Sequence, residues 1–98
     1  MRYTYYTSGT CSSQIDLELD EQGNLTDVQF YGGCHGNLQG ICTLVRGMKA
    51  SEVISKLQGI RCGYKNTSCP DQLATALREA LADLAKRKED NKTINTSI

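Results

Sequence analysis

The chain has 98 residues, enough for one domain with a modest hydrophobic core. Its eleven basic and eleven acidic residues balance without a dense cationic run, which argues against nucleic-acid binding through phosphate contacts. No apolar run approaches the roughly 18 residues of a membrane span, and the N-terminus lacks a signal peptide's apolar stretch. We therefore expect a cytoplasmic protein that binds neither nucleic acid nor membrane.

The N-terminal part of the chain carries strand patterns. Residues 3–7 are aromatic and threonine-rich, and residues 15–19 alternate apolar with acidic side chains. Turn-forming residues at 21–24 precede a third apolar stretch at 25–31. The sequence thus predicts three strands, of which the second and third pair as a hairpin.

Helical periodicity follows the strands. Apolar residues are spaced as one helix face over residues 37–48, over a short segment at 51–58, and over a long segment at 70–88. The order β-β-β-α-α-α predicts an α+β fold, a three-stranded antiparallel sheet with helices packed on one face. We expect a single domain over residues 1–88 and a polar, disordered tail at 89–98.

Five cysteines are many for a chain that carries no secretory signal, so metal or thiol chemistry outranks a disulfide scaffold. Cys42 falls on the inward stripe of the first helix, where a cysteine acts as a small hydrophobe. Cys11 lies in a loop before the second strand, and Cys34 lies where the third strand gives way to a helix. Cys62 and Cys69 bracket a loop, so the fold could gather these four thiols in one site.

Cys69 precedes Pro70, which suits the first position of a helix and makes Cys69 the expected N-cap. The partial positive charge of a helix N-terminus favours a thiolate, and Cys34 also enters a helix. Zinc ions and iron–sulfur clusters are typically coordinated by about four soft ligands. The sequence therefore predicts zinc or iron–sulfur binding by a set of four: Cys11, Cys34, Cys62 and Cys69.

Two other classes of function remain open. The first is a thiol enzyme or sulfur-relay protein that uses Cys34 or Cys69 as a nucleophile. The second is a structural domain with unliganded cysteines that assembles as a homodimer. His35 could be a ligand, a proton acceptor or an exposed loop residue. The glycine-rich run 32–40 lacks a P-loop ending but could bind the phosphate of a nucleotide.

From about residue 3 to residue 84 the chain resembles the TSCPD-domain family, named after the motif at Thr67–Asp71. Four further segments carry the likeness: Gly33-Cys34, Gly36–Gly40, Gly47-Met48 and Gly59–Gly63. The family's longer members are ribonucleotide reductases, so the resemblance implies a cysteine metal site and a link to nucleotide reduction and DNA synthesis. It implies a ribonucleotide reductase or an iron–sulfur protein as partner. A chain this short has no room for a reductase barrel, so we expect no enzyme activity of its own.

The chain is more distantly similar to iron–sulfur scaffold proteins of the NifU/IscU type. Cys11, Cys34 and Cys69 follow the order of the scaffold's cysteines, which implies a NifU/IscU-like fold. The scaffold's aspartate, two residues after the first cysteine, is replaced here by Ser13. With Cys62 as a fourth thiol, a closed and static metal site is expected instead of labile cluster transfer.

Overall fold

The structure is a computed structural model that describes residues 1–10, 12–33, 35–61, 63 and 66–96, without the side chains of residues 35 and 89–96. Three strands precede three helices, as the sequence predicts. Their bounds are β1 (Arg2–Tyr6), β2 (Ser12–Leu19), β3 (Leu25–Gly32), α1 (His35–Val45), α2 (Ala50–Leu57) and α3 (Cys69–Thr96).

The strands form an antiparallel sheet in the order β1-β2-β3. Ile15 in the central strand lies opposite Tyr5 on one side and Phe30 on the other. The turn between β2 and β3 is closed by the Asp20 carboxylate, which accepts a hydrogen bond of 2.8 Å from the Asn24 backbone N–H. The predicted hairpin is therefore confirmed.

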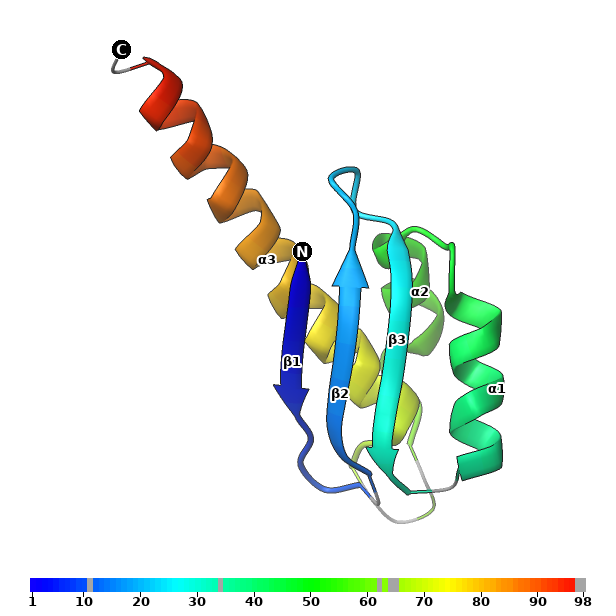
Figure 1. The fold of residues 1–98 in the computed structure, drawn as a ribbon. Coiled ribbons are helices and arrows are strands. Elements are labelled where there is room, and N and C mark those ends of the chain that lie inside the picture. The colour runs from blue at the N-terminus through cyan, green and yellow to red at the C-terminus, as the bar shows by residue number, and fades with distance from the viewer. Residues whose placement is uncertain (11, 34, 62, 64–65, 97–98) are drawn as a thin grey trace.

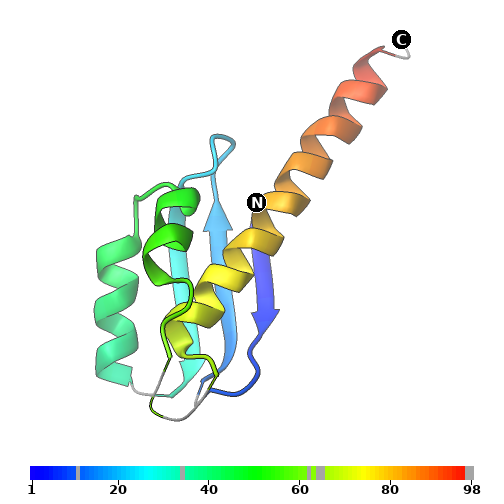
Figure 2. The ribbon, with the colours of Figure 1, turned by 180° about the vertical axis from the view of Figure 1, so that it is seen from behind.

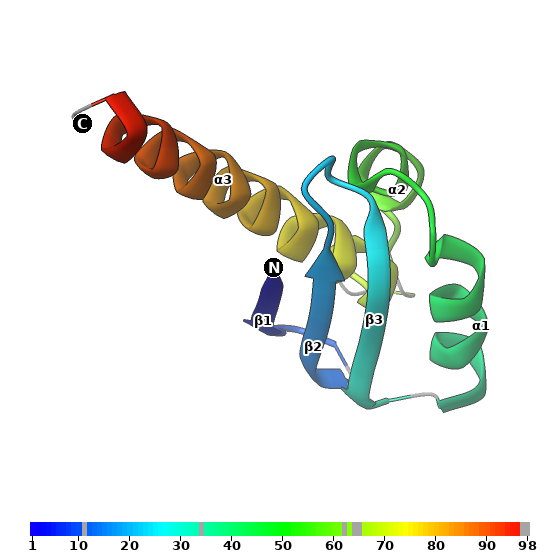
Figure 3. The same cartoon turned by 45° about the horizontal axis from the view of Figure 1, so that its top comes forward.

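All three helices cover the same face of the sheet (Figures 1 and 2). With the top of the molecule tilted forward, α3 crosses behind β1 and β2, whereas α1 lies beside β3 (Figure 3). The alternation in β2 buries Ile15, Leu17 and Leu19 toward the helices, where Leu73 and Leu77 of α3 join the core. The expected α+β arrangement with helices on one face is confirmed, because the period-2 strands and the helical stripes bury their apolar sides together.

The first helix is displaced relative to its predicted range. It begins at His35 and ends at Val45, so Met48 lies outside it. Gly47 has a φ of +92°, which ends the helix, and its N–H donates to the Leu25 carbonyl at 2.6 Å. The Leu25 N–H in turn donates to the Met48 carbonyl at 2.8 Å. The backbone of this connection therefore pairs with the start of β3 instead of continuing the helix.

The last helix is longer than the hydrophobic stripe predicts. It is helical to Thr96, beyond the expected boundary near Lys88, and its C-terminal part projects past the sheet (Figure 1). Lysine, arginine and glutamate have good helix propensity, so the helix can continue beyond the end of its hydrophobic stripe. The disorder expected for residues 89–98 stays a prediction. Within the part of the chain that the structure describes, no helix is suited to crossing a membrane.

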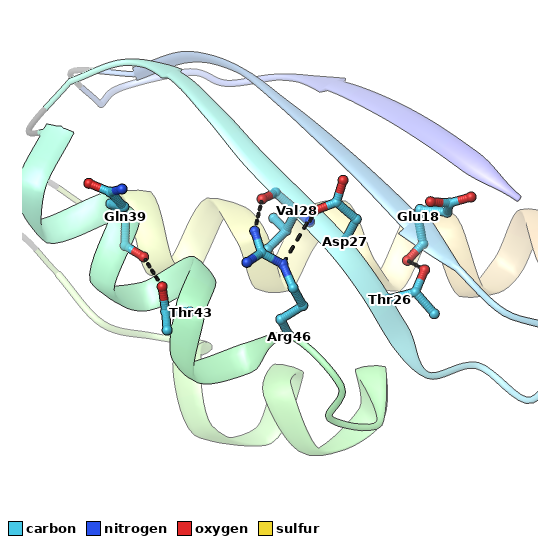
Figure 4. Close-up of polar contacts among 7 residues, drawn as sticks. All are labelled: Glu18, Thr26, Asp27, Val28, Gln39, Thr43 and Arg46. Carbon is cyan, nitrogen blue, oxygen red and sulfur yellow. Dashed lines mark hydrogen bonds and ion pairs between the residues drawn. The ribbon is translucent and has the colours of Figure 1, made fainter.

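The outer edge of β3 is covered by α1. The Arg46 guanidinium donates to the Val28 carbonyl at 3.4 Å and pairs with the Asp27 carboxylate at 3.3 Å (Figure 4). An unpaired strand edge is a template for pairing with another chain. Arg46 therefore both fastens α1 to the sheet and occupies a carbonyl that a further strand would need.

Candidate functional site

The candidate site lies at the end of the sheet shown at the bottom of Figure 1, where the described residues of the β1–β2 and α2–α3 connections lie close to the end of β3. In the sequence, Cys11 belongs to the β1–β2 connection and Cys34 to the β3–α1 connection. Cys62 belongs to the α2–α3 connection, which Cys69 directly follows. Cys69 is in the described part of the chain, whereas Cys11, Cys34 and Cys62 lie outside the described residues. The site is therefore built from Cys69 and from the residues that flank the other three.

Described side chains connect these segments directly. Ser12, the residue after Cys11, pairs with Gly32 in the sheet, and its Oγ lies 3.2 Å from the Cys69 Sγ. The Ser8 N–H donates to the Gln72 Oε1 of α3 at 3.0 Å. The β1–β2 connection is thus in contact with the start of α3 and with the end of β3.

Ser68 caps the N-terminus of α3. Its Oγ accepts a hydrogen bond of 3.2 Å from the Asp71 N–H, and its carbonyl accepts one of 2.8 Å from the Gln72 N–H. The prediction of Cys69 as N-cap was therefore wrong: Cys69 is the first helical residue and Pro70 the second. The physical reason is that a serine hydroxyl is a strong acceptor for a helical N–H, whereas a thiol is a weak one.

Asp71 and Ser68 also close the loop that precedes α3. The Asp71 carboxylate accepts from the Gly59 N–H at 2.7 Å and from the Thr67 hydroxyl at 2.5 Å. The Ser68 hydroxyl donates to the Ile60 carbonyl at 2.5 Å. We call the bonds from Gly59 to Asp71 and from Ser68 to Ile60 the loop clasp, because they join the two ends of the loop 60–68.

The comparison with known families bears on this same segment. The family model described as the TSCPD domain matches residues 1–81. The chain belongs to the TSCPD-domain family. No curated protein and no solved structure matches it. The resemblance to NifU/IscU-type scaffold proteins stays a prediction.

In this TSCPD domain the residues of the motif divide into two roles. Ser68 and Asp71 form the helix cap and the loop clasp, and Thr67 donates to the Asp71 carboxylate, so hydrogen bonding accounts for all three residues. Cys69 takes no part in the cap or the clasp, and its side chain is 7 % exposed. The structural part of the motif therefore fixes the position of one buried thiol at a helix N-terminus.

The Asp71 carboxyl has a pKa below its usual value, chiefly because the Thr67 hydroxyl and the Gly59 N–H stabilise the charged form. A lowered folded-state pKa contributes stability above the unfolded pKa of about 3.9, and this stability is lost as the pH falls through the folded pKa. We therefore expect Asp71→Asn to lower the free energy of unfolding by about 1 kcal/mol at pH 7 and by progressively less in acid. Urea unfolding between pH 7 and pH 3, with chelator present, measures this difference.

The matched control is Asp83→Asn, which removes a carboxylate that pairs with Arg87 at 3.3 Å on the surface of α3. Exposed pairs of this kind contribute little, so a loss of about 0.5 kcal/mol at most is expected. Equal losses in the free energy of unfolding at every pH would show that the Asp71 carboxylate stabilises the fold no more than an exposed ion pair does.

Cys42 behaves as the sequence predicts. It is buried in the core, and burial raises the pKa of its thiol. It lines a groove of about 200 Å³ between β3 and α1, together with Val28, Phe30, Leu38 and Arg46. Because Cys42 packs within the buried hydrophobic cluster, we retain it as a core residue.

The described residues test only some of the other predicted site residues. Among the described residues, no cluster of three or more histidine, cysteine or acidic side chains is placed to hold a metal ion. The four-cysteine set extends beyond those residues and stays a prediction, as does a role for the His35 side chain. Sequence reasoning missed Ser12, which lies beside the Cys69 sulfur. The position of this small polar residue directly after Cys11, a predicted ligand, is the feature of the sequence that could have identified it.

Proposed function

We propose that this TSCPD domain is a metal-binding accessory module. It binds a zinc ion or an iron–sulfur centre through four thiolates: Cys11, Cys34, Cys62 and Cys69. The observation that carries the proposal is the 3.2 Å contact between Ser12 Oγ and Cys69 Sγ, because it brings the segment after Cys11 onto the sulfur of another proposed ligand. Four thiolates form the closed tetrahedral set typical of a structural zinc site.

The surroundings of Cys69 suit a metal-bound sulfur. Cys69 is the first residue of a 28-residue helix and is buried beside the Ser12 hydroxyl. The loop clasp joins the ends of the chain segment that carries Cys62 and leads to Cys69. Holding both ends of such a segment lowers the conformational entropy that two ligands lose on binding one metal.

The approach of β3 supports a contribution from Cys34. Gly32 pairs with Ser12 at the end of the sheet that adjoins Cys69, and α1 begins at His35. Gly32, two residues before Cys34 in the sequence, therefore lies beside Ser12, which contacts the Cys69 sulfur. This placement supports Cys34 as a further ligand.

A thiol enzyme or sulfur-relay protein with Cys34 or Cys69 as nucleophile is the alternative. The 7 % exposure of Cys69 leaves little of its side chain open to a substrate, which favours the role of a ligand. Selective alkylation of a single cysteine near neutral pH would favour the alternative. A metal-free protein with uniformly unreactive cysteines would favour a structural domain.

We place the module in the cytoplasm, where cysteines stay reduced and available to a metal. Ribonucleotide reduction, and with it DNA synthesis, or the handling of iron–sulfur clusters is the proposed context. The proposed partner is a ribonucleotide reductase or an iron–sulfur protein, with a homodimer as an alternative assembly. The balanced charge of the chain gives no support to a nucleic-acid partner.

Metal analysis of protein purified without air tests the proposal. We expect one zinc ion or one cluster per chain in the wild type. Cysteine-to-serine substitution at positions 11, 34, 62 and 69, one at a time, should abolish stoichiometric binding or weaken it at least about tenfold, because each removes a ligand. Cys42→Ala is the matched control and should retain the metal, since Cys42 lies in the hydrophobic core.

Two results would contradict the proposal. One is a wild-type protein that contains no stoichiometric zinc or iron and takes up neither when they are supplied. The other is a series in which the four serine variants hold as much metal as Cys42→Ala. Either result would favour a thiol enzyme, a sulfur-relay protein or a structural domain instead of a metal-binding module.

A further inference from the structure

Ser12 places a buried hydroxyl beside the Cys69 sulfur. Its side chain is 5 % exposed, and its Oγ lies 3.2 Å from the Cys69 Sγ. The two residues are far apart in the chain, at the first position of β2 and the first position of α3. A polar group that is buried without a hydrogen bond costs free energy, so this contact accounts for a serine in an otherwise enclosed position.

The backbone and hydroxyl of Ser12 are held from the β1–β2 connection. The Thr7 hydroxyl donates to the Ser12 carbonyl at 2.5 Å. The Thr10 Oγ1 lies 3.2 Å from the Ser12 Oγ and 3.3 Å from the Ser12 carbonyl oxygen. Ser12 is therefore fixed at its backbone and has a neighbouring hydroxyl that can donate to its own oxygen.

The protonation state of the sulfur decides the direction of the Ser12–Cys69 bond. A thiol can donate to the Ser12 Oγ, but a metal-bound thiolate has no proton and can only accept. With metal bound, the Ser12 hydroxyl must donate to the Cys69 sulfur, and its oxygen can accept the Thr10 hydroxyl proton in place of the Ser12 carbonyl oxygen. In that arrangement the three side chains form a chain of donors that ends on the sulfur.

We infer that Ser12 is a positioning residue that donates its hydroxyl proton to the metal-bound sulfur of Cys69. This inference rests on the proposed metal-binding function. The hydrogen bond orients the sulfur and stabilises its negative charge, as groups around a ligand commonly do in metal sites. Ser12 thus acts on the metal through Cys69 and is not itself a ligand.

The neighbouring Ser13 provides a matched control. A register shift between Ser12 and Gln14 interrupts the alternation of the strand, and burial distinguishes the two serines: Ser12 is 5 % exposed and contacts the Cys69 sulfur. The Ser13 side chain is exposed, and its hydroxyl donates to the Tyr31 carbonyl at 3.2 Å. A serine-to-alanine change at each position removes the same atom, but only one of them faces the sulfur.

The test measures zinc affinity and zinc release in the metal-loaded full chain, with a chromophoric chelator as competitor. Ser12→Ala should bind zinc about 10-fold more weakly than the wild type, in the range usual for groups that support a ligand. Ser13→Ala should stay within about two-fold of the wild type. In cobalt-substituted protein, the sulfur-to-cobalt charge-transfer band should shift in Ser12→Ala and not in Ser13→Ala.

A second pair of variants covers the case in which Ser12→Ala does not fold. Ser12→Thr and Ser12→Val have nearly the same shape but differ in the hydroxyl, so threonine should retain affinity that valine loses. Equal affinities for threonine and valine, or for Ser12→Ala and Ser13→Ala, would overturn the role of Ser12 while leaving metal binding intact. A wild type that binds no metal would overturn the proposed function itself, and the inference with it.

Discussion

Leu77→Ala is expected to lower the free energy of unfolding by about 3 to 5 kcal/mol. The Leu77 side chain is 0 % exposed and lies in the core between α3 and the sheet. Truncation removes buried apolar atoms and leaves a cavity that close-packed neighbours fill only in part. Because domains have a total stability of about 5 to 15 kcal/mol, this variant should unfold in much less urea than the wild type.

Leu44→Ala is the matched control for this substitution. Leu44 is also a helical leucine, but its side chain on α1 is 77 % exposed. Alanine has the best helix propensity and little buried contact is lost, so we expect a change within about 0.5 kcal/mol. Equal losses of stability in the two variants would show that Leu77 of α3 stabilises the fold no more than an exposed leucine does.

The core could be predicted because its signal is local and repetitive. Ile15, Leu17 and Leu19 alternate with acidic residues, and one strand face follows directly from that alternation. Leu73 and Leu77 are spaced four residues apart, which places them on one face of a helix. Burying both faces together leaves few arrangements of so short a chain, and the α+β order follows.

The helix boundaries were harder to predict because individual hydrogen bonds decide them. Met48 fits the stripe of the first helix, but its carbonyl accepts from the N–H of Leu25, which no periodicity reveals. Cys69 before Pro70 resembles an N-cap, but the Ser68 hydroxyl accepts from the Asp71 N–H instead. In each case a hydrogen bond that the apolar periodicity does not include sets the boundary.

The candidate site was predictable in its thiols but not in its supporting residues. A cysteine is a rare residue with distinctive chemistry, so Cys69 attracts attention in any sequence. Ser12 and Gly59 are of types that are common in loops, and their contacts with Cys69 and Asp71 depend on the folded arrangement. Sequence reasoning considered Ser13 because of the scaffold resemblance, whereas the adjacent residue is the one that faces the sulfur.

Many described residues at the end of the sheet that carries the candidate site are small and polar, among them Ser8, Thr10, Ser12, Thr67 and Ser68. Hydrogen bonds hold these segments together, and each contributes only about 1 kcal/mol net. A metal bound by four cysteines would cross-link the three connections at this end and take the place of a hydrophobic contact.

Metal removal is therefore expected to destabilise the protein strongly. With free zinc at about 1,000 times the dissociation constant, binding contributes about 4 kcal/mol to folding. For a domain of this size that corresponds to a fall in Tm of roughly 15 °C or more when a chelator removes the metal. Thermal unfolding followed by circular dichroism, before chelation, after chelation and after zinc is restored, measures the effect.

Two variants show whether the effect comes from the four-cysteine site. Cys69→Ser should show a smaller chelator-dependent fall in Tm than the wild type, and none if the substitution abolishes binding, because it has lost the ligand at the start of α3. Cys42→Ala should melt lower than the wild type yet keep the full chelator-dependent shift, since its change affects the core alone. A ligand that binds only the folded state must stabilise it. If chelator left the Tm of the metal-loaded wild type unchanged, the metal would therefore not cross-link the three connections.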